Sequence, residues 1–336
     1  MIDIVFTLDY EIYGNGAGSL EALVYKPAHK LAAAFRRQDA AFVAFVEALE
    51  FEQIERNSSD SAIGLVKDQV KELHDTGFEI GLHLHPQWAN ASYKDGSWQL
   101  DSSEYNLCTL TRKRIVEIVD RSIAYLRYLV DDPKFVPLSF RAGNWLFQPS
   151  REAARVLAER GLRIDSSVFK GGLQRSHGLD YRRTLKYGPY WRFGEDVTQP
   201  DLRGSWIEVP IHSEMVFPLR MARPRRLGFG NAVGLTNGSA SRKVYRMLDF
   251  LRFQCPLKLD FCRLTLQELV SMMTKIIRHD REDPSGYRPI VAIGHTKDLI
   301  DPDTVEGFLS FLKANHVNIC TFNNVFAALS GVTAMA

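Results

Sequence analysis

The sequence predicts an α/β fold, a distorted parallel barrel of the (β/α)7 type with long loop insertions. Two observations predict it. Short apolar runs typical of buried strands alternate along the chain with segments whose apolar residues recur at helical spacing. This alternation is typical of a parallel sheet covered by helices. In addition, polar residues gather where the predicted strands end, which is where parallel barrels carry their chemistry.

The predicted elements follow one another in the order that such a barrel requires. The helices are amphipathic, and two of them stop at Gly77 and Gly161, as helices often do. The predicted strands span 2–8, 40–46, 78–85, 135–141, 162–165, 290–295 and 317–321. The predicted helices span 27–37, 61–75, 111–130, 150–160, 265–279 and 302–314, with a final helix after 321.

The chain of 336 residues is long enough for one large domain or two ordinary ones. No internal repeat and no low-complexity linker divides it, so we predict a single catalytic domain over 1–336. Polar and aromatic residues, turn residues and arginines interrupt the alternation in two places. We therefore expect elaborations at about 86–110 and 170–260.

Composition excludes several function classes. A formal net charge of +2 gives no general case for nucleic-acid binding, and no apolar run is long enough to span a bilayer. Met1 leads directly into the first predicted strand, with no basic region or cleavage site of a secretion signal. The four cysteines form no Cys-x-x-Cys pair, which favours reduced thiols. We expect a cytoplasmic protein with no transmembrane segment and no nucleic-acid partner.

Polar side chains end five of the predicted strands. The first strand runs into Asp-Tyr-Glu and a later one into His-Leu-His, and each pair shares a face because successive strand residues point to opposite sides. A cap, a surface ion pair or a buried histidine would explain any one of these residues alone. Unrelated accidents would not all fall at strand ends, however. The residues are Asp9, Glu11, His83, His85, Arg141, Asp165 and His295.

These residue types together suit hydrolysis at a metal ion. Two imidazoles and one carboxylate form a common ligand set for catalytic zinc. A second carboxylate can take a proton from water, a separate histidine can protonate a leaving group, and an arginine can keep the base ionised. A nucleophilic serine is not indicated, because no Gly-x-Ser-x-Gly elbow occurs. The glycines of 228–234 follow no strand of a βαβ unit, so a dinucleotide site is not indicated either.

In these motifs the sequence resembles the polysaccharide deacetylase family, the NodB-homology domain of carbohydrate esterase family 4. The resemblance covers about 1–170 and 285–330. Asp-x-Glu and His-x-His match a divergent branch, since common members have adjacent aspartates and a longer histidine spacing. The resemblance implies a distorted barrel and metal-dependent removal of an N-acyl group, in most cases N-acetyl. The substrate would be an amino sugar or a glycan precursor.

The resemblance also implies roles for the polar residues. Glu11, His83 and His85 would bind a divalent metal, with zinc expected, although the longer spacing in common members leaves the role of His85 open. Asp9 would be the general base, and Arg141 would position it.

On the acid side, the resemblance makes His295 the general acid and Asp165 the residue that tunes it. Ile293 would line the pocket for the acyl methyl group. The long loops carry Trp88 and Trp145, together with Trp98 and Trp191, as candidates for stacking on a sugar ring, although any of them could instead belong to the core.

Other interpretations stay open at this point. A barrel glycoside hydrolase could use Asp9 and Asp165 as its two carboxylates. A non-catalytic glycan-binding protein could keep the fold without the reaction. The arginines of 220–226, followed by glycines and Arg242-Lys243, form either a solvated loop or an anion site for a phosphorylated substrate.

Overall fold

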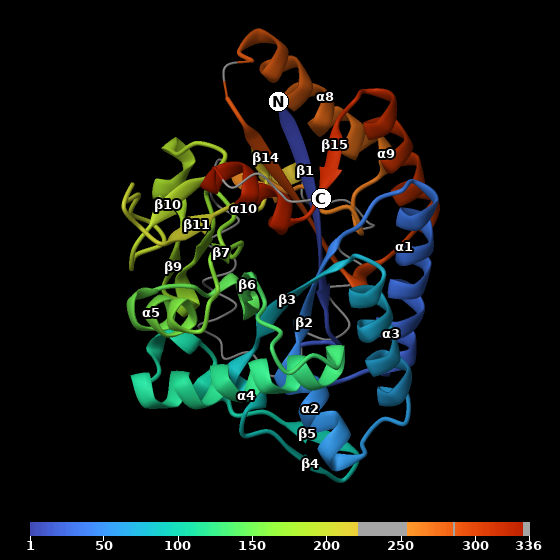
Figure 1. Cartoon of the computed structure of the whole chain (residues 1–336), viewed down its shortest axis with the longest axis vertical. Helices are drawn as coiled ribbons and strands as arrows, with labels where there is room; N and C mark the ends of the chain where they lie inside the picture. Colours follow the sequence, from blue (N-terminus) through green and yellow to red (C-terminus); the bar gives the residue numbers. More distant parts are fainter. Residues whose placement is uncertain (221–253, 285, 332–336) are drawn as a thin grey trace.

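The computed structural model of the chain describes residues 1–220, 254–284 and 286–331 (Figure 1). Its main sheet has nine strands and curls round on itself. In spatial order the strands are β10 (Trp191–Phe193), β11 (Trp206–Glu208), β7 (Ile164–Asp165), β6 (Ser139–Ala142), β3 (Glu79–Leu84), β2 (Val43–Glu47), β1 (Ile2–Tyr10) and β14 (Arg288–His295), and β15 (Asn318–Cys320) pairs with β1. Apart from the antiparallel pair β10–β11, every neighbouring pair is parallel.

A single residue bridges the two ends of the curled sheet. Ile211, just after β11, makes isolated parallel bridges to Phe169 and to Val291 of β14. The amide of His212 also donates to the carbonyl oxygen of Val291, at 3.0 Å. These contacts bring the curled sheet round into a distorted barrel, which confirms the predicted (β/α)-type parallel fold.

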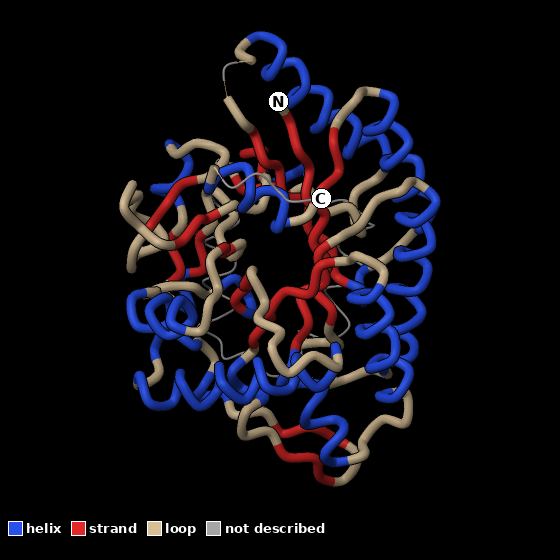
Figure 2. Tube along the Cα trace, viewed as in Figure 1, coloured by secondary structure: helices blue, strands red, loops and turns tan. Residues whose placement is uncertain are grey.

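Most of the helices cover the outer face of this sheet (Figure 2). Their ends carry the expected caps: Thr265 and Glu268 form a capping box at the start of α8, and Asp301 caps α9 ahead of Pro302. The helices are α1 (Lys26–Arg37), α2 (Ala48–Asn57), α3 (Ile63–Asp75), α4 (Arg112–Val130), α5 (Arg151–Glu159), α8 (Leu266–Glu282), α9 (Pro302–Ala314) and α10 (Phe322–Ser330). Within the described residues no helix combines the length and apolar character that crossing a bilayer requires.

Several elements differ from the sequence-based expectation. Helix α2 was not predicted, because its short segment is rich in glutamates that mask the apolar face. The expected loop at 86–110 contains a small antiparallel hairpin, β4 (Ser92–Lys94) with β5 (Ser97–Gln99). The described part of 170–260 holds two more, β8 (Leu173–Gln174) with β9 (Leu179–Asp180), and β12 (Ser213–Val216) with β13 (Cys255–Lys258). Strands this short leave too little periodicity to recognise.

The core between the sheet and helices α1 and α9 is rich in aromatic residues. Phe6 of β1 is fully buried and meets three other rings edge-on. The ring centroids lie 5.0 Å from Phe35 of α1, 5.2 Å from Phe261 and 5.9 Å from Phe308 of α9. Edge-to-face contacts of this kind stabilise a core beyond the area that they bury.

We expect Phe6→Ala to lower the free energy of unfolding by about 3–5 kcal/mol, because it removes a buried ring and leaves a cavity. Urea denaturation followed by circular dichroism measures the change. Phe217→Ala is the matched control: Phe217 is 55% exposed, so its removal should cost less than about 0.5 kcal/mol. Similar losses for the two variants would contradict the placement of Phe6 at the centre of the core.

Candidate active site

The register of the parallel strands brings the predicted site residues together. Asp9 of β1 pairs with His295 of β14, and His83 of β3 pairs with Glu47 of β2 on one side and Arg141 of β6 on the other. Neighbouring parallel strands in register present these side chains at one level of the barrel. All but His295 are buried.

Glu11, His83 and His85 form one compact cluster. The Oε2 atom of Glu11 lies 3.0 Å from Nε2 of His85 and 3.5 Å from Nε2 of His83. One possible ligand atom from each residue falls within 4.8 Å of the others. Burial raises the pKa of Glu11, but Lys297 and the histidines outweigh it and hold that pKa well below its usual range.

The hydrogen bonds of His83 leave one nitrogen facing this cluster. Its Nδ1 lies 2.9 Å from the carbonyl oxygen of Arg141, which can only accept, so Nδ1 carries a proton. Its Nε2 is buried and has no hydrogen-bond partner in the described structure. A histidine held by a backbone carbonyl, with its other nitrogen aimed at a carboxylate and a second imidazole, fits a divalent metal ligand.

Metal binding by His83 requires the imidazole to lose a proton. Burial lowers the pKa of His83, but the carboxylates of Asp9 and Glu11 outweigh it and raise the pKa to about 9. A divalent ion that binds here must therefore displace a proton, so its affinity should rise with pH.

His85 is positioned by a glycine just after the neighbouring strand β6. A side chain at Gly143 would put its Cβ 2.6 Å from the carbonyl oxygen of Leu84 and 2.7 Å from the imidazole of His85. The Nδ1 atom of His85 lies 3.3 Å from the side-chain amide of Asn144. Burial lowers the pKa of His85, which favours the neutral form that a metal ligand needs.

A second set of donors overlaps the first. Asp9, Glu11 and His295 also offer ligand atoms within 4.8 Å of one another. Asp9 is already bound by an arginine, however, whereas His83 has an unpartnered nitrogen. The set with two histidines is therefore the better candidate for a metal.

Asp9 is held by a buried arginine. Nη1 of Arg141 donates to Oδ1 of Asp9 at 2.6 Å, and Nη2 donates to the Thr7 hydroxyl at 2.9 Å. Nε of Arg141 donates to the carbonyl oxygen of Ser166 at 2.9 Å. Burial raises the pKa of Asp9, but the Arg141 guanidinium outweighs it and the pKa is lowered. Asp9 is therefore an ionised carboxylate in a fixed orientation.

His295 faces Asp9 from the neighbouring strand. Its Nε2 lies 3.3 Å from Oδ2 of Asp9, and its Nδ1 lies 3.5 Å from Oδ2 of Asp298. Burial lowers the pKa of His295 to about 4, against the opposing effect of both carboxylates. The imidazole is therefore neutral at pH 7.

The expected partnership of Asp165 with His295 is wrong. Asp165 accepts hydrogen bonds from the hydroxyl and amide of Ser167, at 2.7 and 3.2 Å, and pairs in register with Glu208 of β11. The acid beside His295 is Asp298, which Arg263 binds at 2.7 Å. The Asp165 carboxylate is directed at Ser167 and Glu208, whereas Asp298 follows His295 by only three residues, in the turn after β14.

The sequence reasoning also missed charged residues next to the cluster. Lys297 donates to Oε1 of Glu11 at 2.7 Å and to the carbonyl oxygen of Ile12 at 2.9 Å. Glu47 accepts from the amide of His85, and Glu50 accepts from the amide of Ile12. Glu47 directly follows the predicted strand 40–46, so its position at a strand end was a usable signal. Lys297 lies after its strand, where no periodicity applies.

Some of the tryptophans proposed to stack on a sugar lie in the core, and one lies at the site. Trp88 is fully buried and packs edge-on against Trp98, so the expectation that a sugar stacks on Trp88 is wrong. Trp191 is also buried, and its indole N–H donates to the carbonyl oxygen of Val197. Trp145 lies at the site, with its ring centroid 6.0 Å from that of His295.

Two further expectations concern positions beside the site. Ile293 is fully buried on β14, two residues before His295 and therefore on the same strand face, and its role at the acyl group stays a prediction. Of the arginine-rich segment, Arg220 is described and exposed, whereas Arg223, Arg225, Arg226, Arg242 and Lys243 lie outside the described residues.

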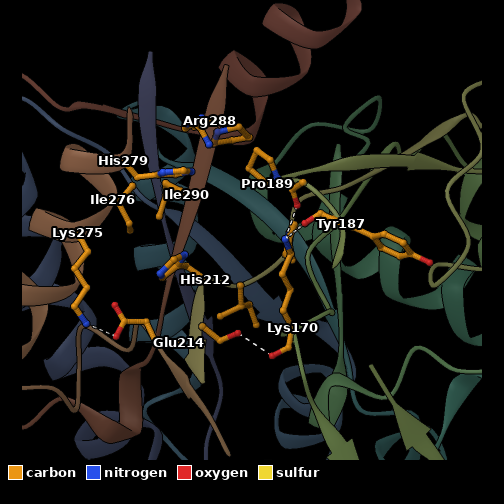
Figure 3. Close-up of a pocket in the computed structure, with 15 residues that line it drawn as sticks. Lys170, Tyr187, Pro189, His212, Glu214, Lys275, Ile276, His279, Arg288 and Ile290 are labelled. Carbon is orange, nitrogen blue, oxygen red and sulfur yellow. Dashed lines mark hydrogen bonds and ion pairs between the residues drawn. The ribbon is translucent and has the colours of Figure 1, made fainter. Parts of the chain in front are cut away.

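A separate cavity of about 490 Å³ opens at the start of β14, away from His295 (Figure 3). Its lining includes Lys170, His212 and Arg288, and an ion pair between Lys275 and Glu214 crosses one side. None of the site residues predicted from the sequence lines this cavity.

Comparison with known proteins identifies the fold. No protein-family model matches the chain, and no curated protein matches it in sequence. A solved structure designated a polysaccharide deacetylase, from Mycobacterium smegmatis, matches with a TM-score of 0.56 at 12% identity, over 100% of this chain and 93% of the other. Puue allantoinase matches at 0.54 and 11% identity, over 97% and 90% of the two chains.

A third match is a GH57 branching enzyme from Thermococcus kodakaraensis, at a TM-score of 0.54 and 14% identity, over 99% of this chain and 72% of the other. The chain therefore has the polysaccharide-deacetylase fold. Because the three matched proteins carry the names of different enzymes, the reaction has to be argued from the site itself.

The buried pair of Asp165 and Glu208 generates a prediction about pH. Burial raises the pKa of both carboxyls, and their proximity raises that of Glu208 further. A group whose pKa is raised on folding contributes stability below its unfolded pKa, and that contribution is lost as pH rises toward the folded pKa. Glutamine does not ionise, so Glu208→Gln does not lose stability in this way. The free energy of unfolding of Glu208→Gln, relative to that of the wild type, should therefore increase between pH 5 and pH 8.

We expect that relative increase to reach at least about 1 kcal/mol, since one pKa unit corresponds to about 1.4 kcal/mol. Urea denaturation of both proteins at each pH measures it, and groups common to the two proteins largely cancel in the difference. A difference in unfolding free energy that stays constant with pH would show that Glu208 does not titrate as a buried acid.

Proposed function

We propose that the chain is a metal-dependent carbohydrate N-deacetylase, an amide hydrolase that removes an N-acyl group from an amino sugar or glycan precursor. N-acetyl is the expected acyl group. One observation carries the proposal: two histidines and a carboxylate converge beside a separate carboxylate that a buried arginine holds ionised. The polysaccharide-deacetylase fold supports the same reaction class. We also propose that residues 1–336 act as one catalytic domain.

Glu11, His83 and His85 are the proposed metal ligands, with zinc as the expected ion. When bound, the ion supplies a Lewis acid that activates water and polarises the acyl carbonyl. Lys297 occupies Oε1 of Glu11 and so leaves Oε2 directed at the two histidines. Lys297 is therefore proposed to orient Glu11 within this ligand set.

Asp9 is the proposed general base. Its Oδ1 is taken by Arg141, which leaves Oδ2 to accept a proton from water. The ion pair with Arg141 keeps Asp9 ionised at neutral pH and aims the carboxylate. Arg141 acts here as a positioning residue, because its guanidinium is bound to Asp9, Thr7 and Ser166.

His295 is the proposed general acid, and its surroundings suggest how it acquires its proton. The imidazole is neutral at pH 7, so it has no extra proton to give at the start. Its Nε2 lies 3.3 Å from Oδ2 of Asp9. A proton that Asp9 takes from water can pass to His295 and then to the departing amine. Asp298 stabilises the imidazolium that forms in between.

Two side chains are proposed to contact the substrate. Trp145 offers an aromatic ring beside His295 for a sugar face, and Ile293 lies on the same strand face as His295, where an acyl methyl group would be placed. The glycoside-hydrolase alternative is weaker, because Asp165, the second carboxylate that it needs, is bonded to Ser167 and paired with Glu208.

Protein purified without chelator should contain close to one equivalent of a divalent metal, because the donors of Glu11, His83 and His85 are already preassembled. Elemental analysis gives the stoichiometry. His83→Ala should lose the metal, whereas His29→Ala, an exposed histidine on α1, should retain it. Folded wild-type protein that takes up no ion after zinc reconstitution would reject the proposed centre.

Asp9→Asn should lower turnover by at least about 10²-fold, the usual scale for losing a general base, while the metal content stays unchanged. The assay is acetate release from a panel of N-acetylated amino sugars. Asp68→Asn, which changes an exposed carboxylate on α3, should have no effect. Near-normal turnover by Asp9→Asn would remove Asp9 from the base role.

Asp9→Asn also leaves the buried Arg141 without its carboxylate, so folding is checked by circular dichroism. His295→Gln provides a second test, with a similar expected loss of turnover and no loss of metal. Two further assays separate the alternative reactions. Reducing-sugar release without acetate would favour a glycoside hydrolase, and opening of allantoin would favour an amide hydrolase that does not act on sugars.

A further inference from the structure

Lys258, the last residue of β13, lies against the aromatic side chains of the proposed site. Its Nζ is 2.8 Å from the ring centroid of Trp145 and 4.6 Å from that of Phe169. Backbone hydrogen bonds tie the following residues to the strand that carries His295. The amide of Ile293 donates to the carbonyl of Leu259, and the amide of Phe261 donates to the carbonyl of Ile293, both at 2.9 Å.

The tryptophan beneath Lys258 is held in an unusual conformation. Asn144 and Trp145 have φ values of 53° and 60°, in the left-handed region that a bulky residue such as tryptophan rarely adopts. The carbonyl oxygen of Trp145 accepts a hydrogen bond from the hydroxyl of Tyr181 at 2.7 Å, which fixes this turn. Strain of this kind persists where the surrounding structure imposes it, and it is concentrated at functional sites.

Lys258 differs from the other cations around the site because they are paired with carboxylates. Arg141 is paired with Asp9, Lys297 with Glu11, and Arg263 with Asp298, at 2.6 to 2.7 Å. In the described part of the chain, no carboxylate oxygen forms an ion pair with Nζ of Lys258.

The acid nearest in sequence does not neutralise this lysine. Oδ1 of Asp260 accepts from the backbone amides of Cys262 and Arg263, both at 3.1 Å. The aromatic rings offset only part of the cost of desolvating an ammonium group. Burial lowers the pKa of Lys258 well below its usual range, and Asp260 and Asp9 only partly oppose this shift. An anion bound beside Nζ would relieve the imbalance.

We infer that Lys258 and Trp145 form a subsite for an anionic group of the substrate, a phosphate or a carboxylate attached to the acylated amino sugar. The inference rests on the proposed function and narrows its substrate class. Trp145 packs edge-on against His295, so a group bound at Lys258 lies within one sugar unit of the proposed proton donor. The ammonium would pair with the anion, while the partnered cations of the site stay with Asp9, Glu11 and Asp298.

The test is binding of reaction products, which turnover cannot consume. Isothermal titration of the metal-loaded protein compares glucosamine with glucosamine 6-phosphate, glucosamine 1-phosphate and glucosaminuronic acid. The wild type should bind at least one of the anionic sugars about 10- to 100-fold more tightly than glucosamine, the scale of a hydrogen bond to a charged group. Rising salt should reduce this preference. The preferred sugar tells whether the group is a phosphate or a carboxylate.

Lys258→Met should reduce the ratio of the two affinities to near one, and Lys258→Arg should restore most of it. Methionine keeps an apolar chain against the rings, so folding should be preserved, and Lys258→Gln serves if it is not. Lys186→Met is the matched control: Lys186 is exposed and its Nζ lies 5.7 Å from the ring centroid of Tyr187, so its loss should leave the ratio unchanged.

Equal affinity of the wild type for charged and neutral sugars, or an unaltered ratio in Lys258→Met, would overturn the inference. Failure of the proposed function gives a different result. Anion-selective binding that depends on Lys258, without acetate release from any sugar of the panel, would support the subsite and count against the deacetylase reaction.

Discussion

The arrangement of the site depends on the buried side chain and backbone of one arginine. The guanidinium of Arg141 binds Asp9 and Thr7 of β1 and both the hydroxyl and the carbonyl of Ser166, just after β7. Its own carbonyl oxygen fixes Nδ1 of His83 on β3. One residue of β6 therefore sets the orientation of the proposed base and of one proposed metal ligand. A buried ion pair is costly to break, because the partner that remains is left charged and desolvated.

The buried acids fall into two groups, according to whether a cation lies within hydrogen-bonding distance. Asp9 and Glu11 have cations within hydrogen-bonding distance, and those cations lower their pKa values despite burial. Among the described residues, no cation lies within hydrogen-bonding distance of Glu47, Glu50 or Glu208, and burial raises their pKa values, that of Glu47 to about 8. The same side chain is thus ionised in one place and protonated in another. Both acids that the proposed mechanism needs in ionised form have such a cationic partner.

The same reasoning separates the fold from the reaction. The fold is shared with proteins named as a polysaccharide deacetylase, an allantoinase and a GH57 branching enzyme. Its contribution is to bring the carboxyl ends of β1, β3, β6 and β14 to one level. The reaction depends on the side chains at these strand ends and on the cations that neutralise their carboxylates. The proposed subsite at Lys258 follows the same reasoning. An ammonium group without a carboxylate partner favours a substrate that carries an anionic group.

The sequence by itself determined the alternation of strands and helices and the polar strand ends. The pairs Asp9–Glu11 and His83–His85 could be placed on shared faces because strand periodicity is local. Strand order and loop packing are not local, and the tertiary structure alone decided what depends on them. It paired Asp165 with Glu208, packed Trp88 into the core, and brought Lys258 against Trp145. These contacts join residues whose spacing in the chain carries no period, so only the packed structure could reveal them.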